Sequence, residues 1–216
     1  MRAICRRCAL PALTVCACAA ALTGCGGGGG ARRTAPRPPR VFIDVVAALP
    51  AGLDPADGGA GSAALQTSLA ATLVRPAAPA LGASKLPPPG DVTGYLATGW
   101  RRLGDGSYVF ALRRGVRSSY GHSLSAADVV FSFRRELARS AGARELAAVG
   151  RISAGNPATA LGRSRVRVNV TGGGGPLTLP ALADFHFGVL DSAAVRGHER
   201  GGDSGHAWLA RHLAYY

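Results

Sequence analysis

The sequence predicts an α/β fold, in which strands and helices share one folded region. Two observations carry this prediction. In residues 107–112 (SYVFAL) larger side chains alternate with smaller ones, and in residues 165–170 (RVRVNV) polar side chains alternate with valines. This is the period of a strand with one face on a core. Residues 125–137 instead carry a helix start signal followed by apolar residues at helical spacing. The folded region therefore contains both kinds of element.

The N-terminus has the composition of an export signal. Three arginines in the first seven residues precede an uncharged, mostly apolar run over residues 8–23, which is short for a membrane-spanning helix. The run ends in LTGC (residues 22–25), which looks like a bacterial lipobox, where a peptidase cleaves before the cysteine. We expect residues 1–24 to be removed and the thiol of Cys25 to carry a diacylglycerol. The alternative is an ordinary secretory signal in which Cys25 is incidental.

All five cysteines lie in the first 25 residues. After cleavage only Cys25 remains, which excludes an internal disulfide, a cysteine nucleophile and a thiolate metal site in the mature chain. Residues 25–40 are rich in glycine, proline and arginine, and we predict a solvated tether there. The folded domain is then residues 41–216. Acyl chains on Cys25 would hold the protein on the extracytoplasmic face of the cell membrane.

The net charge of +13 raises the question of nucleic-acid binding. Two observations argue against it: the chain carries an export signal, and its arginines are spread from Arg75 to Arg211 without one dense basic tract. We therefore predict no nucleic-acid partner. Attraction to anionic membrane lipid is the expected by-product of this charge.

Four elements are predicted before residue 95. Val41–Val46 (VFIDVV) is a β-branched and aromatic run, which is typical of a buried strand. Leu53–Ala56 (LDPA) belongs to a turn-rich segment. Leu65–Val74 has apolar residues at helical spacing, and the proline-rich stretch over residues 76–91 is predicted to be a surface loop.

A hairpin and a helix follow. The turn Gly104-Asp105-Gly106 lies between two extended runs, of which the second directs Tyr108, Phe110 and Leu112 toward a core, and Gly115 suits a positive backbone angle. Ser125 and Asp128 have the spacing of a capping box. The helix that they open is predicted to bury an apolar stripe made of Val129, Val130, Phe133 and Leu137. Three arginines should face water on its other side: Arg134, Arg135 and Arg139. The helix should stop near Gly142.

The last part of the chain is less regular. The strand over residues 165–170 should direct Val166, Val168 and Val170 inward, and the glycines at 172–175 form a loop that lacks the Gly-Lys-Ser/Thr of a phosphate cradle. Residues 177–187 are apolar but contain a proline, residues 191–206 are polar, and residues 208–216 form a short amphipathic end.

No arrangement of residues indicates catalysis. The five histidines lie in unrelated segments, and neither an H-E-x-x-H nor a G-x-S-x-G motif occurs. Asp128 is explained as a capping residue, and His186 as a part-buried packing residue. We therefore predict a non-enzyme without catalytic residues, metal ligands or cofactor. An exported hydrolase would need a nucleophile–base pair, which the sequence does not offer.

The segment from Tyr95 to Leu137 resembles the family 5 extracellular solute-binding proteins of ABC importers, which include oligopeptide-, dipeptide- and nickel-binding lipoproteins. The matching positions follow the order of the family pattern: Leu96-Ala97, Trp100, Asp105-Gly106, Tyr108, Phe110, Leu112-Arg113, Gly115-Val116, Gly121, Leu124-Ser125-Ala126, Asp128-Val129 and Ser132. Weaker matches lie at residues 53–56, 187–191 and 206–209. The turn at Ser118–Tyr120 departs from the pattern, which has an aromatic residue soon after the Gly-Val pair.

This resemblance implies the N-terminal part of lobe one of a two-lobed, type II periplasmic-binding-protein-like fold, an α/β architecture with a mixed sheet and helices. It also implies capture of a peptide or similar small solute for an ABC permease. Family members are more than twice as long and enclose their ligand between two lobes, so we leave the ligand-binding residues unknown. The alternative is a truncated lipoprotein without transport activity, either a surface interaction module or a non-functional fragment.

Overall fold

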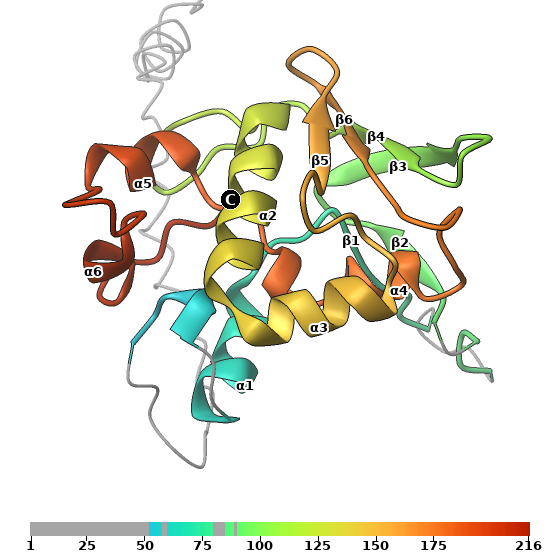
Figure 1. Ribbon diagram of the computed structural model, residues 1–216, viewed down its shortest axis with the longest axis horizontal. Coiled ribbons are helices and arrows are strands. Elements are labelled where there is room, and N and C mark those ends of the chain that lie inside the picture. The colour runs from blue at the N-terminus through green and yellow to red at the C-terminus, as the bar shows by residue number, and fades with distance from the viewer. Residues whose placement is uncertain (1–51, 58–59, 80–84, 89) are drawn as a thin grey trace, which may run out of the picture. The chain divides into compact units, whose positions relative to one another are not determined.

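The computed structural model of the chain describes residues 52–57, 60–79, 85–88 and 90–216 (Figure 1). The export signal, the tether with Cys25 and the strand expected at Val41–Val46 lie outside these residues. Helices and strands are both present, which confirms the predicted α/β class. Among the described residues, no helix is both long and apolar enough to cross a bilayer.

The strands form two antiparallel sheets. The smaller one pairs β1 (Val74–Pro76) with β2 (Val92–Gly94), and the larger one has the order β3-β4-β6-β5. Its strands are β3 (Ala97–Arg102), β4 (Tyr108–Leu112), β5 (Ala158–Ala160) and β6 (Arg165–Val168). The alternation in the sequence sets the face of each side chain. Because Trp100 lies opposite Phe110 and Phe110 opposite Val166, these apolar side chains share one face of the sheet.

The predicted hairpin between β3 and β4 is confirmed. Leu103 donates its backbone N–H to the carbonyl of Ser107 at 2.7 Å, and Gly106 has a φ of +84°. A Cβ on Gly106 would also overlap the carbonyl of Gly173. The glycine-rich loop at 172–175 therefore packs directly on this turn, and both the backbone angle and the close approach require glycine.

The helical elements are short except for α2 (Ala126–Arg139), which packs against the larger sheet (Figure 1). The other helical elements are listed here in chain order: η1 (Pro55–Asp57), α1 (Ala60–Leu69), α3 (Ala141–Val149), α4 (Thr178–Ala181), η2 (Phe185–Phe187), α5 (Ser192–Gly197) and α6 (His206–Leu209).

The main core lies between α2 and the sheet. The predicted stripe of α2 is buried at Val129, Phe133 and Leu137, and the predicted inward valines Val166 and Val168 have no exposed surface. A second, smaller cluster packs α5 and α6 against the C-terminal residues. α2 contacts both groups of elements, because α5 packs against it as well as the strands (Figure 1).

Two predicted helix limits were wrong. The helix expected at Leu65–Val74 ends at Leu69, because the chain extends before β1 and buries Leu73 and Val74 there. The helix expected to stop near Gly142 ends at Arg139. Ser140 stops it and caps α3 by accepting the backbone N–H of Ala143 at 3.1 Å, so Gly142 lies inside α3.

Candidate functional site

A buried ion pair joins the N-terminal turn to α2. The Nη1 and Nη2 atoms of Arg135 donate to the two carboxylate oxygens of Asp54 at 2.9 and 2.5 Å. The side chains of Arg135 and Asp54 are 2% and 0% exposed. The prediction that Arg135 faces water was therefore wrong. The physical reason is its partner, because a carboxylate that folds over α2 from far along the sequence can take a guanidinium out of water.

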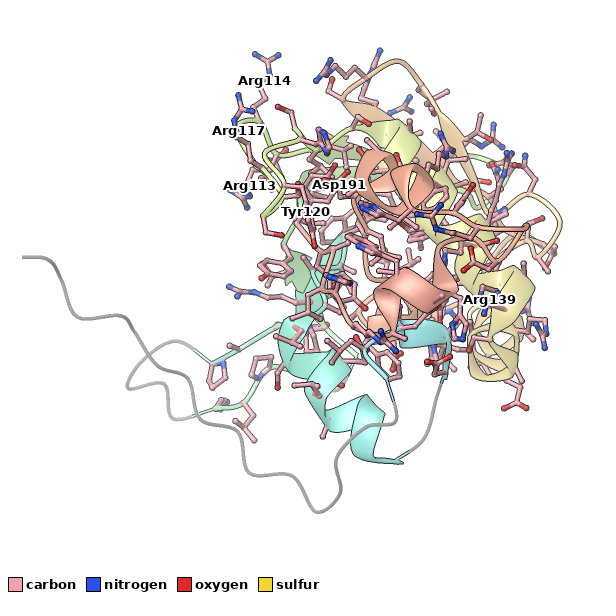
Figure 2. All side chains as sticks on the ribbon, turned by 90° about the vertical axis from the view of Figure 1, so that its left-hand side faces the viewer. Arg113, Arg114, Arg117, Tyr120, Arg139 and Asp191 are labelled. Atoms are coloured by element: carbon pink, nitrogen blue, oxygen red, sulfur yellow. The ribbon has the colours of Figure 1, made fainter. Side chains whose placement is uncertain are left out.

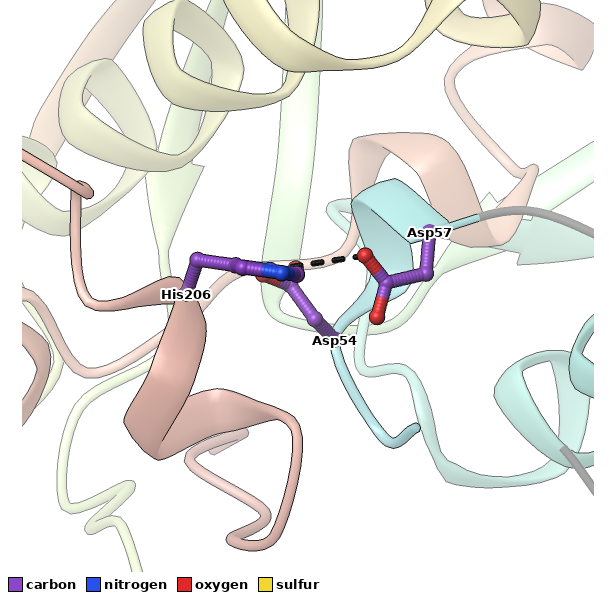
Figure 3. Close-up of side chains that lie close together, drawn as sticks. All are labelled: Asp54, Asp57 and His206. Carbon is purple, nitrogen blue, oxygen red and sulfur yellow. Dashed lines mark hydrogen bonds and ion pairs between the residues drawn. The ribbon is translucent and has the colours of Figure 1, made fainter. Parts of the chain in front are cut away.

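His206 extends this cluster (Figure 3). Its Nδ1 lies 2.9 Å from Oδ2 of Asp54 and 3.4 Å from Oδ1 of Asp57. One donor atom from each of the three residues lies within 4.8 Å of the others, a spacing that suits a cation. Both oxygens of Asp54 already accept hydrogen bonds from Arg135, whose positive charge opposes a metal ion at the same carboxylate. The arrangement favours a structural ion-pair cluster over a metal centre.

The buried carboxylates of Asp54 and Asp191 are held in their ionised form. Burial raises the pKa of Asp54, but the hydrogen bonds and charge of Arg135 and the hydrogen bond of His206 outweigh it, so the pKa is lowered. Burial also raises the pKa of Asp191. Hydrogen bonds from the Ser118 hydroxyl, the Ala194 backbone N–H and the His122 ring outweigh this effect, so the pKa of Asp191 is lowered as well. Both carboxylates therefore stabilise the fold when they are charged.

We expect the free energy of unfolding to decrease as the pH falls below about 4, the pKa of an aspartate in an unfolded chain. In the folded chain the pKa values of Asp54 and Asp191 lie below the unfolded value. Their contribution to the free energy of unfolding is therefore complete above the unfolded pKa, and it is lost as the pH falls toward the folded pKa. Glu136 acts in the opposite direction, because burial raises its pKa. Urea unfolding from pH 7 to pH 3 measures the effect. The free energy of unfolding of an Asp191→Asn variant should decrease less over this range than that of the wild type. A wild-type free energy of unfolding that stays constant down to pH 3 would contradict the prediction.

A second polar cluster joins the N-termini of α2 and α5. The predicted capping box is present: Oδ2 of Asp128 accepts from the backbone N–H of Ser125 at 2.8 Å and from its hydroxyl at 2.6 Å. The other oxygen accepts from the backbone N–H and the hydroxyl of Ser192 at 3.0 and 2.7 Å. Asp128 therefore caps one helix and holds another, and only the first role has a local sequence signal.

Ser118, His122 and Asp191 come together without forming a nucleophile–base pair. The hydroxyl of Ser118 donates to Oδ2 of Asp191 at 2.5 Å, and Nδ1 of His122 lies 2.8 Å from the same oxygen. In a catalytic triad the histidine lies between the serine and the carboxylate and takes the serine proton. Here the serine and the histidine both bind the carboxylate, and Ser118 is only 7% exposed. The trio orders the loop beside Tyr120 (Figure 2) and has no geometry for acyl transfer.

His186 is a packing residue, as predicted. Its Nδ1 lies 3.0 Å from Oε1 of Glu136, and its side chain is 13% exposed. A Cβ on Gly142 would come within 2.8 Å of the Nε2 atom of His186, so the glycine in α3 makes room for the ring. The histidine thereby ties α3 and η2 to α2.

The surface of the described residues offers shallow hollows. One of about 250 Å³ is bounded by α1, β1, α4 and η2, and another of about 300 Å³ lies beside Arg113, Arg114 and Arg163. Ligand pockets in proteins run from about 300 to 1,000 Å³ and bury most of the ligand. Neither hollow is large enough to enclose a peptide, so ligand-binding residues stay unassigned.

Comparison with solved structures identifies the fold. The chain is similar to Haemophilus influenzae OppA in complex with the peptide RPPGFSPFR, with a TM-score of 0.59 and 19% identity over 74% of this chain and 31% of that one. It is similar to Helicobacter pylori DppA in complex with the peptide STSA, with a TM-score of 0.53 and 23% identity over 71% and 31% of the two chains. A third is MoaA from A. tumefaciens R10 in complex with mannopinic acid, with a TM-score of 0.54 and 25% identity over 70% and 29%.

These likenesses confirm, at the level of the fold, the resemblance to the family 5 solute-binding proteins and the expected substrate-binding-protein architecture. The chain spans about three tenths of the length of the solved proteins that it matches. Neither a protein-family model nor a curated protein sequence matches it.

Proposed function

We propose that this chain is the N-terminal part of lobe one of an extracytoplasmic solute-binding lipoprotein. The protein captures peptides or similar small solutes and delivers them to an ABC permease. Cys25 carries the lipid anchor, which keeps the protein on the outer face of the cell membrane. Capture is non-covalent: a ligand held between two lobes shifts an equilibrium between open and closed forms, and the permease recognises the closed form.

One observation carries this proposal. The motif from Tyr95 to Leu137, matched to the solute-binding family by its residues, adopts a hairpin and a capped helix within a fold shared with solved peptide- and solute-binding proteins. Residues of this motif are mostly structural. Phe110 and Phe133 fill the core, and Asp128 holds two helix N-termini. We therefore propose that the motif serves as a scaffold for the lobe.

Thermal unfolding of residues 31–216, with and without a mixed peptide pool, tests ligand capture. A cooperative transition that rises with the pool, and does not rise with an equal concentration of free amino acids, supports peptide binding by this part of the protein. The absence of a cooperative transition favours the second candidate in its form as a non-functional fragment.

The second candidate is a lipoprotein without transport activity, which acts as a surface interaction module or is a non-functional fragment. It is favoured by one observation, because neither of the two hollows described above is large enough to enclose a peptide. Sequencing the gene past the codon for Tyr216 separates the two candidates. An open frame that encodes a second lobe favours the importer protein, and its absence favours the interaction module or fragment.

A further inference from the structure

Exposed arginines gather where the larger sheet meets the loop that follows β4. We name this group the arginine rim, and its members are Arg113, Arg114, Arg117, Arg163 and Arg165. Figure 2 shows the first three projecting outward from the same side of that loop. The sequence concealed this group, because its members come from two segments about 50 residues apart.

Backbone contacts bring the two segments together. Leu112 at the end of β4 donates its N–H to the carbonyl of Ser164 at 2.8 Å. The chain then turns at Gly115, whose φ of +76° suits glycine. The result is a hollow of about 300 Å³ that Arg113, Arg114 and Arg163 help to line. Three arginines therefore line one concave piece of surface.

The positive charge of the rim is not neutralised within the described part of the chain. Ion pairs of arginine occur there at Arg135 and Arg167, and both lie outside the rim. Arg113 donates Nε–H to the carbonyl of Tyr95 at 3.1 Å, and Arg117 donates to the carbonyl of Gly121 at 2.7 Å. These carbonyls hold the side chains in place and leave their charge intact.

Nearby carboxylates do not reach the rim. Asp128 and Asp191 lie at the N-termini of α2 and α5, where both are buried. Their oxygens accept hydrogen bonds from serines, a histidine and backbone N–H groups. The rim is thus a solvent-facing group of positive charges over a rigid base.

We propose that the arginine rim docks the folded domain on the anionic lipid headgroups of the membrane. Charge complementarity carries the proposal, since arginines near an anionic bilayer are each attracted to it and a concave basic surface can hold several phosphates. The proposal goes beyond solute capture and takes from the proposed function only that the protein is tethered to the extracytoplasmic face of the membrane. Docking would fix the orientation of a tethered domain above the membrane.

Vesicle co-sedimentation of the full chain tests the proposal. Vesicles of phosphatidylcholine alone are compared with vesicles that also contain phosphatidylglycerol, at low and at high salt. The N-terminal region and its arginines are the same in the wild type and in the variants, so the difference between them on anionic vesicles measures the charge of the rim. We expect the triple variant Arg114→Gln/Arg163→Gln/Arg165→Gln to reduce partition onto anionic vesicles by about tenfold or more at low salt, and to leave partition onto neutral vesicles unchanged.

The matched control removes the same charge from exposed arginines outside the rim, in the variant Arg134→Gln/Arg200→Gln/Arg211→Gln. Circular dichroism of both variants verifies that they fold. The control variant should keep most of the additional binding that the wild type shows on vesicles with phosphatidylglycerol. An equal loss in both variants would mean that net charge alone acts, and a wild type that binds both vesicle types alike would also overturn the proposal. Neither outcome depends on a solute ligand, so the importer function is tested separately.

Discussion

Replacement of Arg135 by methionine is expected to destabilise the folded chain by about 3–5 kcal/mol, the cost of removing one partner from a buried ion pair. Arg135 supplies two hydrogen bonds to Asp54, and Asp54 has no exposed surface. Methionine fills similar volume but leaves the carboxylate with His206 as its remaining ionisable hydrogen-bond partner. Urea unfolding at pH 7, followed by circular dichroism, measures the change.

Two further variants define the origin of this effect. Arg134→Met changes the preceding residue on the same helix, which is exposed, and should alter stability by no more than about 0.5 kcal/mol. The double variant Asp54→Leu/Arg135→Met removes both charges and should recover part of the loss, because a buried pair can be replaced by apolar groups at little cost. A double variant less stable than Arg135→Met would mean that Asp54 acts through its other contacts.

Elements with local signals could be predicted from the sequence. The hairpin from β3 to β4 has a glycine-marked turn followed by alternating larger and smaller side chains in β4, and each part of that pattern lies within a few residues. The start of α2 has its capping box within four residues. Local hydrogen bonds and local periodicity determine these elements, so a single sequence is sufficient to locate them.

Contacts between distant segments could not be predicted in this way. Arg135 has the position of an exposed residue on α2, and only its pairing with Asp54, 81 residues away, buries it. The second role of Asp128 depends on Ser192, 64 residues away. The arginine rim likewise needs β4 and β6 to be adjacent, and a one-dimensional search for basic tracts does not find it.

The limit of α1 illustrates a different difficulty. Leu65, Leu69, Ala70 and Leu73 have helical spacing, yet the chain leaves the helix at Leu69. The carbonyl of Ala71 accepts a hydrogen bond from the backbone N–H of Val189, so tertiary pairing replaces the next helical turn. Buried backbone groups must find partners, and here those partners lie on distant segments: Leu96 bonds Thr72, Tyr95 bonds Leu73 and Val189 bonds Ala71.

Replacement of Phe133 by alanine is expected to destabilise the fold by about 3–5 kcal/mol, through lost burial and the cavity left behind. Phe133 has no exposed surface, and its ring packs edge-to-face on Phe187 with centroids 4.9 Å apart. The contact joins α2 to η2, so a cavity there loosens the helix from the segment that leads to α5. Urea unfolding measures the loss of free energy.

The matched control is Phe131→Ala, because Phe131 lies on the same helix, is only half-buried, and packs on Arg196 at 4.8 Å. It should cost less than half as much as Phe133→Ala. Equal losses of free energy in the two variants would mean that helix propensity or general apolar burial on α2 determines stability. The Phe133–Phe187 contact would then contribute no more than other apolar contacts of the helix. A large loss confined to Phe133 would instead show that α2 is central to the fold, since this helix contacts the larger sheet as well as α5.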